Sequence, residues 1–287
     1  MTDLAKVYEV YTKLIGNRKK REMKIAMDNP KTVEEHRSYL YEIVRLKLFF
    51  MHRWLAEHPE EKPVDVLRNR IDIYRKTDAN VEALNPATLK WESEAWQVLE
   101  QPLLACYAHH AANAVQFEKE GFAILQHSID ARCERDYFDT SGLLGYQCGS
   151  LRYNIYTEST AVVSFHIANA VRPRSIFDNP HYLPACFLTL MEQVEALYGA
   201  VEIRTGTWLN ENLKWLALFP EEWRNNLQPQ NGDVRYHYGF WGQFITSRGT
   251  FNHRMGEHMR RTGKFFYYPR ASHCTIHAMR THLLGLL

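Results

Sequence analysis

Three groups of side chains have the types and spacing that binding or catalysis requires. The first follows the apolar run that contains His166, where Arg172, Arg174 and Ser175 lie just before a helix-like segment. Arginine forks and the free backbone amides of a helix N-terminus both donate hydrogen bonds to phosphate or carboxylate groups. This pattern predicts an anion-binding loop. A solvated loop whose arginines pair with nearby carboxylates is the alternative.

His166 itself lies between Phe165 and Ile167. In a regular strand its imidazole therefore points to the opposite face from these two apolar side chains. An imidazole in a cleft can act as a general base near neutral pH. A hydrogen-bonded core histidine is the alternative interpretation.

The second group is a set of histidines beyond residue 250. His273 and His277 are four residues apart, so they share one face of a helix that is expected to begin at Ser272. Two imidazoles at this spacing can bind zinc or another divalent metal. The candidate third ligand is His253, with His258 and Glu257 as alternatives. The HExxH signature is absent from the sequence. Histidines exposed on an amphipathic helix, or hydrogen-bonded within the core, are the alternative.

The third group is the basic run of residues 253–264, which precedes the aromatic residues 265–268. Basic and aromatic side chains together can hold single-stranded nucleic acid. The formal net charge is only +2, from 35 lysines and arginines against 33 acidic residues. We therefore expect no nucleic-acid partner, and a solvated helix face or an anionic-substrate pocket explains the same residues.

The elements that must position these groups alternate between strand and helix. Residues 153–170 and 200–208 have strand-like sequences, and residues 183–198 and 211–223 have helix-like sequences. This order predicts an α/β core with a crossover connection, in which ligands bind near the carboxyl ends of the strands. The second strand runs into Asn210, which belongs to a polar junction that a simple turn does not require.

The order strand, arginine-bearing loop, helix, strand, asparagine-containing junction and helix resembles the central part of the fold of the GNAT superfamily of N-acetyltransferases. The resemblance covers residues 153–223, about a quarter of the chain. It implies that the loop from Arg172 to Asp178 wraps the pyrophosphate of an acyl coenzyme A, and that Asn210 or Asn212 lines the same cleft. The loop contains none of the glycines that are usual in that family.

The reaction implied by the resemblance is transfer of an acyl group from a thioester carrier, either coenzyme A or an acyl carrier protein, to an amine of a small molecule. The implied carrier-binding residues are Arg172, Arg174, Ser175 and Asn210. His166 is then the general base. Tyr238 is then the candidate proton donor to the departing thiolate.

Two other functions stay open from the residues alone. One is a metal-dependent enzyme that uses His273, His277 and His253 to bind a divalent metal. The other is a non-catalytic protein that binds a small ligand or a partner, with the helical half presenting the interface. No motif in the sequence decides among the three.

The predicted fold class is α+β, with a helical region (residues 1–118) packed on a mixed α/β region (residues 119–287) that has a central, acyltransferase-like sheet. Helical spacing of apolar residues is clear in residues 34–56. Beyond Gly121 the pattern changes to short strand-like runs. These runs include residues 122–128, 234–246 and 264–268.

Composition limits the class of protein. The chain has 287 residues, 45% of them hydrophobic, which is enough for a large core. Its five cysteines are odd in number and scattered, as in reduced cytosolic proteins, so a cytoplasmic location is expected. No apolar run approaches the ~20 residues of a membrane span, so no membrane partner is expected. An exposed helical half is compatible with a homodimer.

Overall fold

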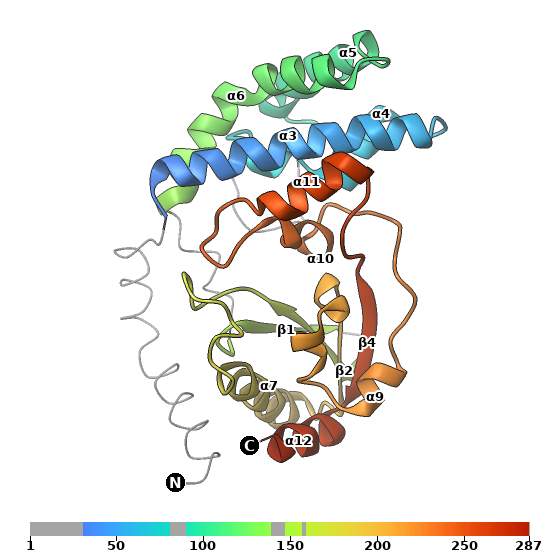
Figure 1. The fold of residues 1–287 in the computed structure, drawn as a ribbon. Helices are drawn as coiled ribbons and strands as arrows, with labels where there is room; N and C mark the ends of the chain where they lie inside the picture. Colours follow the sequence, from blue (N-terminus) through green and yellow to red (C-terminus); the bar gives the residue numbers. More distant parts are fainter. Residues whose placement is uncertain (1–30, 81–89, 139–146, 157–158, 287) are drawn as a thin grey trace. The chain divides into compact units, whose positions relative to one another are not determined.

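The computed structural model describes residues 31–80, 90–138, 147–156 and 159–286 (Figure 1). The chain divides into two compact units. The helical unit takes in Lys31–Gly142 and Asp233–Phe266, and the mixed unit takes in Leu143–Gly232 and Tyr267–Leu287. Helices together with one mixed sheet confirm the expected α+β class.

The mixed unit is built on a four-stranded sheet. In spatial order its strands are β1 (Leu151–Tyr156), β2 (Ser159–Ile167), β3 (Glu202–Thr207) and β4 (Arg270–Thr275). The two outer pairs are antiparallel, whereas the central pair, β2 and β3, is parallel. A parallel pair requires a crossover connection, which the helix α7 (Tyr182–Tyr198) supplies. The crossover predicted from the sequence is confirmed.

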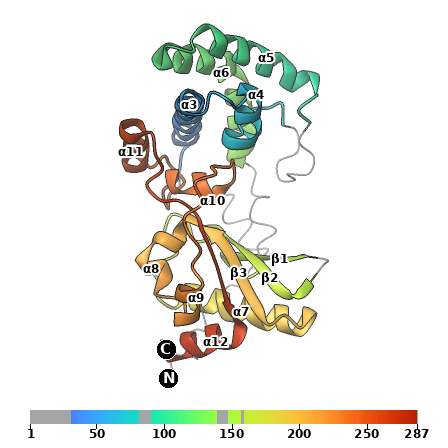
Figure 2. The same ribbon diagram turned by 90° about the vertical axis from the view of Figure 1, so that its right-hand side faces the viewer.

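One face of this sheet forms the apolar core of the mixed unit. Val163, Phe165 and Ile203 alternate with polar residues along β2 and β3 and are fully buried. The ring of Phe165 meets that of Phe187 on α7 edge to face, with the centroids 5.4 Å apart. Figure 2 shows α7 along this side of the sheet, where it contacts α12 (Ile276–Gly285). Because side chains alternate along a strand, the polar residues lie on the opposite face.

Short helices follow β3. They are η5 (Trp208–Glu211), α8 (Leu213–Leu216) and α9 (Glu221–Asn225). Thr207 caps η5 and Asn212 caps α8, because each side-chain oxygen accepts hydrogen bonds from backbone amides of the first turn. The rings of Phe219 and Trp223 are stacked with centroids 4.1 Å apart, and both side chains are fully buried. Buried aromatic contacts therefore anchor these short helices to the core.

The helical unit is organised around α3 (Val33–Glu57) and α6 (Ala114–Phe138), which pack against each other (Figure 1). A capping box starts α3: Glu35 N donates to the Thr32 hydroxyl, and Thr32 N donates to the Glu35 carboxylate. The other elements are α4 (Pro63–Val66), η1 (Leu67–Ile71), η2 (Tyr74–Lys76), α5 (Glu94–His109), α10 (Tyr238–Trp241), η6 (Gly242–Phe244) and α11 (His253–Thr262).

The prediction of a strand at residues 122–128 is wrong, because this segment lies inside α6. Phe122, Leu125 and Ile129 are buried at spacings of three and four residues, which is the period of a helix packed on one face. The same helix runs through residues 118 and 119, where the sequence predicted a boundary between two regions.

The strands predicted at residues 234–246 and 264–268 are also wrong. The first segment forms α10 and η6, and the second is irregular. Both are rich in aromatic residues, and several of these, such as Phe240, Trp241 and Phe265, are buried in the core of the helical unit. For example, the rings of Trp241 and Phe265 both contact the ring of Phe50 on α3, with centroids 5.5 Å and 5.6 Å from that of Phe50. Aromatic residues favour strands in general, but here burial against helices accounts for them.

A buried lysine joins α3 to η1 in this unit. The Lys47 ammonium donates hydrogen bonds to the carbonyl oxygens of Ile71 and Asp72, and it lies 5.0 Å from the centroid of the Trp241 ring. Burial lowers the pKa of Lys47 to about 7, an effect that the nearby Asp72 carboxylate partly opposes. The folded protein therefore releases this proton far more readily than an unfolded chain does.

We expect Lys47 to make the protein more stable as the pH rises from 7 towards 10. In this window the unfolded chain holds a proton on Lys47 that the folded chain lacks, so the free energy of unfolding gains up to about 1.4 kcal/mol per pH unit. Urea unfolding at pH 7.5 and 9.5 measures this slope. Lys47→Met removes it, whereas the exposed Lys264→Met leaves it unchanged. Equal slopes in the wild type and Lys47→Met would contradict the lowered pKa.

Candidate functional site

The face of the sheet opposite α7 carries a row of polar side chains. Asn154, Ser164, Arg204 and His273 are register partners from β1 to β4. The guanidinium Nε of Arg204 donates to Ser164 Oγ at 3.0 Å. His166 is on the same face, and a hydrogen bond of 2.8 Å joins its Nε2 to Asn154 Nδ2. The structure therefore confirms that His166 points away from Phe165, and its ring is only partly buried.

The parallel ladder between β2 and β3 is short. It pairs only residues 162–164 with residues 202–204, although β2 continues to Ile167 and β3 to Thr207. Beyond the last pair, the Thr205 hydroxyl donates to the Phe165 carbonyl oxygen at 2.8 Å, in place of a backbone ladder bond. On the polar face, a Cβ atom added at Gly206 would meet no atom within 4 Å. Space and backbone groups thus lie beside His166 at the carboxyl ends of two parallel strands.

The loop that follows β2 is held by its own polar groups. Asn169 accepts a hydrogen bond from Val171 N and donates one to the Arg174 carbonyl oxygen. Ser175 N donates to the Asp178 carboxylate at 2.8 Å, and Ser175 Oγ accepts from Phe177 N. Ser175 is thus engaged in shaping the loop, and the carboxylate of Asp178 is used by a backbone amide rather than by an arginine.

The two arginines of this loop differ from its other polar residues. Arg172 and Arg174 are exposed, and within the described part of the chain neither guanidinium group has a hydrogen-bond or ion-pair partner. The predicted alternative, in which these arginines pair with nearby carboxylates, is not seen among the described residues. Two cationic forks therefore stand available to an anion next to the end of β2.

Asn210 lies in the core rather than on a surface. It is fully buried, and its Oδ1 accepts hydrogen bonds from the indole Nε1 of Trp215 at 3.0 Å and of Trp223 at 3.3 Å. Its Nδ2 donates to the Arg270 carbonyl oxygen at 2.7 Å. The amide therefore links η5, α8, α9 and β4. Asn212, the alternative residue, uses its Oδ1 to cap α8.

The C-terminal histidines do not share a helix. The prediction of a helix from Ser272 is wrong, because β4 extends to Thr275 and α12 begins only at Ile276. His273 therefore projects from a strand onto the polar face of the sheet, while His277 is exposed on α12. His253, the candidate third metal ligand, is the first residue of α11 in the helical unit.

Tyr238 also belongs to the helical unit, where it is 63% exposed at the start of α10. Its neighbour His237 caps that helix through Nδ1, and burial lowers the pKa of His237. The role of Tyr238 as a proton donor stays a prediction.

Two cysteines that could act as nucleophiles are protonated at neutral pH. Burial raises the pKa of Cys148 to about 12. Burial also raises the pKa of Cys274, and the charges of Glu222 and Glu202 add to this effect. Neither thiol is therefore a ready thiolate.

A different group of side chains with metal-ligand chemistry is brought together in the helical unit. Among the described residues, Cys106, His110 and Glu120 offer a sulfur, a nitrogen and an oxygen within 4.8 Å of one another. Sequence reasoning missed this group. The four-residue spacing of Cys106 and His110 within a predicted helical segment was the signal that could have found it.

In comparisons with known proteins, no family model, no curated protein and no solved structure gives a significant match to the chain. Among the described residues, no helix is both long and apolar enough to cross a membrane.

We expect Asn210→Ala to destabilise the mixed unit by about 3 kcal/mol, because it leaves two buried indole N–H groups and one carbonyl oxygen without a partner. Asn226→Ala is the matched control, since its Nδ2 makes a single longer bond to the His273 carbonyl oxygen, and we expect it to cost about 1 kcal/mol. Urea unfolding measures both. If Asn210→Ala has the stability of the wild type, the structural role of Asn210 is contradicted, and its predicted role in ligand binding is favoured instead.

Proposed function

We propose that the mixed unit is an acyltransferase that takes an acyl group from a phosphate-bearing thioester carrier and passes it to an amine of a small molecule. The observation that carries this proposal is the early end of the β2–β3 ladder beside a loop whose two arginines have no hydrogen-bond or ion-pair partner among the described residues. An acyl carrier has a charged, phosphate-bearing head and an extended polar arm. The arginines of the loop match the charge of the head, and the strand ends beyond the ladder match the hydrogen-bonding groups of the arm.

The order of strands supports the proposal. The arginine-bearing loop leads from β2 into the crossover helix α7 and then into the parallel strand β3, which is the order of elements on which the resemblance to the GNAT superfamily rests. Acyl coenzyme A is the carrier that this resemblance implies. An acyl carrier protein presents the same phosphopantetheine arm.

The head of the carrier is assigned to the loop. Arg172 and Arg174 are the exposed cations there, and a phosphate or diphosphate group accepts several hydrogen bonds from a guanidinium fork. Ser175 and Asn210 contribute indirectly in this proposal, because the first shapes the loop and the second holds the neighbouring helices.

The amide-containing arm is assigned to the ends of β2 and β3. An arm of this kind is held well by backbone N–H and C=O groups that have left a ladder, as in peptides that add to a sheet edge. The thioester at the end of the arm is then placed on the polar face, where Gly206 leaves space for it.

His166 is the proposed general base. It follows the last paired residue of β2 by two positions, on the same face as Ser164, and its Nε2 accepts a hydrogen bond from Asn154 Nδ2. Nε2 is therefore the unprotonated nitrogen, and it gives up the bond to Asn154 when it takes the amine proton. In the reaction the amine nitrogen attacks the thioester carbonyl carbon, the carbon–sulfur bond breaks, and the amine proton passes to His166. The departing thiolate then takes up a proton from solvent.

We expect the double variant Arg172→Ala with Arg174→Ala to weaken binding of coenzyme A by at least about tenfold, because each lost charge-assisted hydrogen bond is worth roughly 1.5–3 kcal/mol. Isothermal titration calorimetry measures the dissociation constant. Arg254→Ala with Arg261→Ala removes two exposed arginines of α11 and serves as the charge-matched control. Unchanged affinity for coenzyme A in the loop variant, or an equal loss of affinity in the control, would contradict the proposal that this loop binds the carrier.

For His166→Asn we expect kcat to fall by at least about a hundredfold while the dissociation constant of coenzyme A changes little, since a general base acts on the chemical step. Acyl transfer to a panel of amines, followed by release of free thiol, gives kcat. His277→Asn on the exposed face of α12 is the control and retains activity. Tight carrier binding without any turnover in the wild type would instead favour a non-catalytic binding protein.

A further inference from the structure

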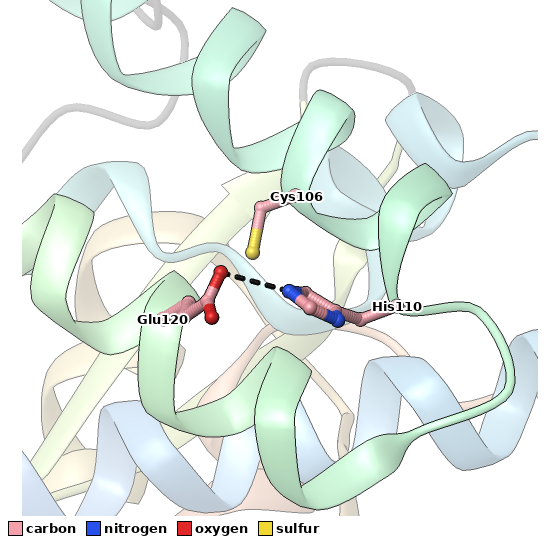
Figure 3. A group of neighbouring side chains, drawn as sticks. All are labelled: Cys106, His110 and Glu120. Atoms are coloured by element: carbon pink, nitrogen blue, oxygen red, sulfur yellow. Dashed lines mark hydrogen bonds and ion pairs between the residues drawn. The ribbon is translucent and has the colours of Figure 1, made fainter.

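A turn between two helices brings three ligand-type side chains together in the helical unit. Cys106 lies in the last turn of α5, His110 is the residue that ends this helix, and Glu120 lies near the start of α6. Figure 3 shows the sulfur, one imidazole nitrogen and one carboxylate oxygen directed toward a common point. The distance between His110 Nε2 and Glu120 Oε2 is 2.8 Å.

The positions of these side chains are fixed by the backbone around them. His110 N donates to the Cys106 carbonyl oxygen, and Asn113 N donates to the His110 carbonyl oxygen across the turn. The carboxylate of Glu120 is oriented by a second hydrogen bond, in which Gln116 Nε2 donates to Oε1 at 2.6 Å. A group held in this way needs little reorganisation to bind an ion.

We propose that Cys106 Sγ, His110 Nε2 and a Glu120 carboxylate oxygen bind a divalent transition metal, with zinc as the best match. A thiolate and an imidazole are preferred ligands of zinc, and a carboxylate is the usual third donor in sites of mixed composition. Binding replaces the hydrogen bond between His110 and Glu120 with two bonds to the ion. The hydrogen on His110 Nε2 is exchanged through solvent to Nδ1, and the thiol proton is released to solvent. This site is separate from the histidines His273, His277 and His253.

The arrangement fits a metal site better than a cysteine nucleophile with its base. A catalytic cysteine needs one imidazole nitrogen, and the orienting carboxylate takes the other. Here the carboxylate is bonded to Nε2, and Figure 3 shows the second ring nitrogen turned away from the sulfur. Cys106 is also buried at the carboxyl end of α5, where the helix dipole disfavours a thiolate that has no ion beside it.

Three protein ligands leave one position of a tetrahedral ion for water or a substrate atom. Solvent reaches the group from the side of Glu120, whose side chain is 48% exposed, whereas the side chain of His110 is 12% exposed and Cys106 is buried. The proposed site is therefore of the open type rather than a closed structural site.

The test uses the full chain, stripped with a chelator and titrated with Co²⁺ and then with Zn²⁺. We expect about one ion per chain, a near-ultraviolet charge-transfer band from the cobalt–thiolate bond, and a higher melting temperature with Zn²⁺. Cys106→Ser should abolish the charge-transfer band. Glu120→Gln should weaken Zn²⁺ affinity by at least about tenfold, since even changes around the ligands have effects of this size.

The matched control is His109→Ala. This imidazole is exposed and adjacent, with its ring centroid 4.5 Å from that of His110, but it lies outside the group of three. It should bind Co²⁺ as the wild type does. If the charge-transfer band persists in Cys106→Ser, or if the wild type binds no more Zn²⁺ than Glu120→Gln, the proposal is overturned. Far-ultraviolet circular dichroism verifies that each variant is folded.

Discussion

The parallel pairing of β2 with β3 is the constraint on which the rest of the mixed unit depends. Parallel neighbours cannot be joined by a tight turn, so the chain must leave the end of β2, return through α7 and enter β3 from the other end of the sheet. The loop of Arg172 and Arg174 and the segment after Thr207 consequently begin at carboxyl ends of adjacent strands. This topology brings cations and strand ends together without any direct bond between them.

Asn210 links the elements that follow the carboxyl end of β3 to the neighbouring strand β4. Its one amide satisfies two indole N–H groups and a strand carbonyl oxygen in a region without exposure to water. Buried donors such as those of Trp215 and Trp223 require a partner, so the asparagine and the tryptophans must be considered together. A polar residue at a strand-to-helix junction can thus serve the core alone.

The sequence was sufficient for elements whose pattern and burial agree. Val163, Phe165 and Ile203 alternate with polar residues, and β2, α7 and β3 were predicted in the right order. Prediction from the sequence failed where closely spaced apolar residues are buried against helices rather than within a sheet. Phe122 is part of a long helix, and Trp241 fills a core of helices, yet both lie in runs that resemble strands. The prediction that His273 and His277 share one face failed for a different reason. A four-residue spacing places two side chains on one face only if both lie in the same helix.

What separates a candidate site from a structural one is whether its polar groups are already satisfied. By residue type alone, Ser175, Asn210 and Arg172 looked equally suited to a ligand. Their hydrogen bonds separate them: the serine and the asparagine bond to backbone and core partners, whereas the guanidinium group has no partner in the part of the chain that the structure describes. In the trio of Cys106, His110 and Glu120, the hydrogen bond between the imidazole and the carboxylate lies within the group itself, so binding an ion breaks no contact between these two atoms and the rest of the protein. Because partners come from distant parts of the chain, this distinction becomes visible only in the folded structure.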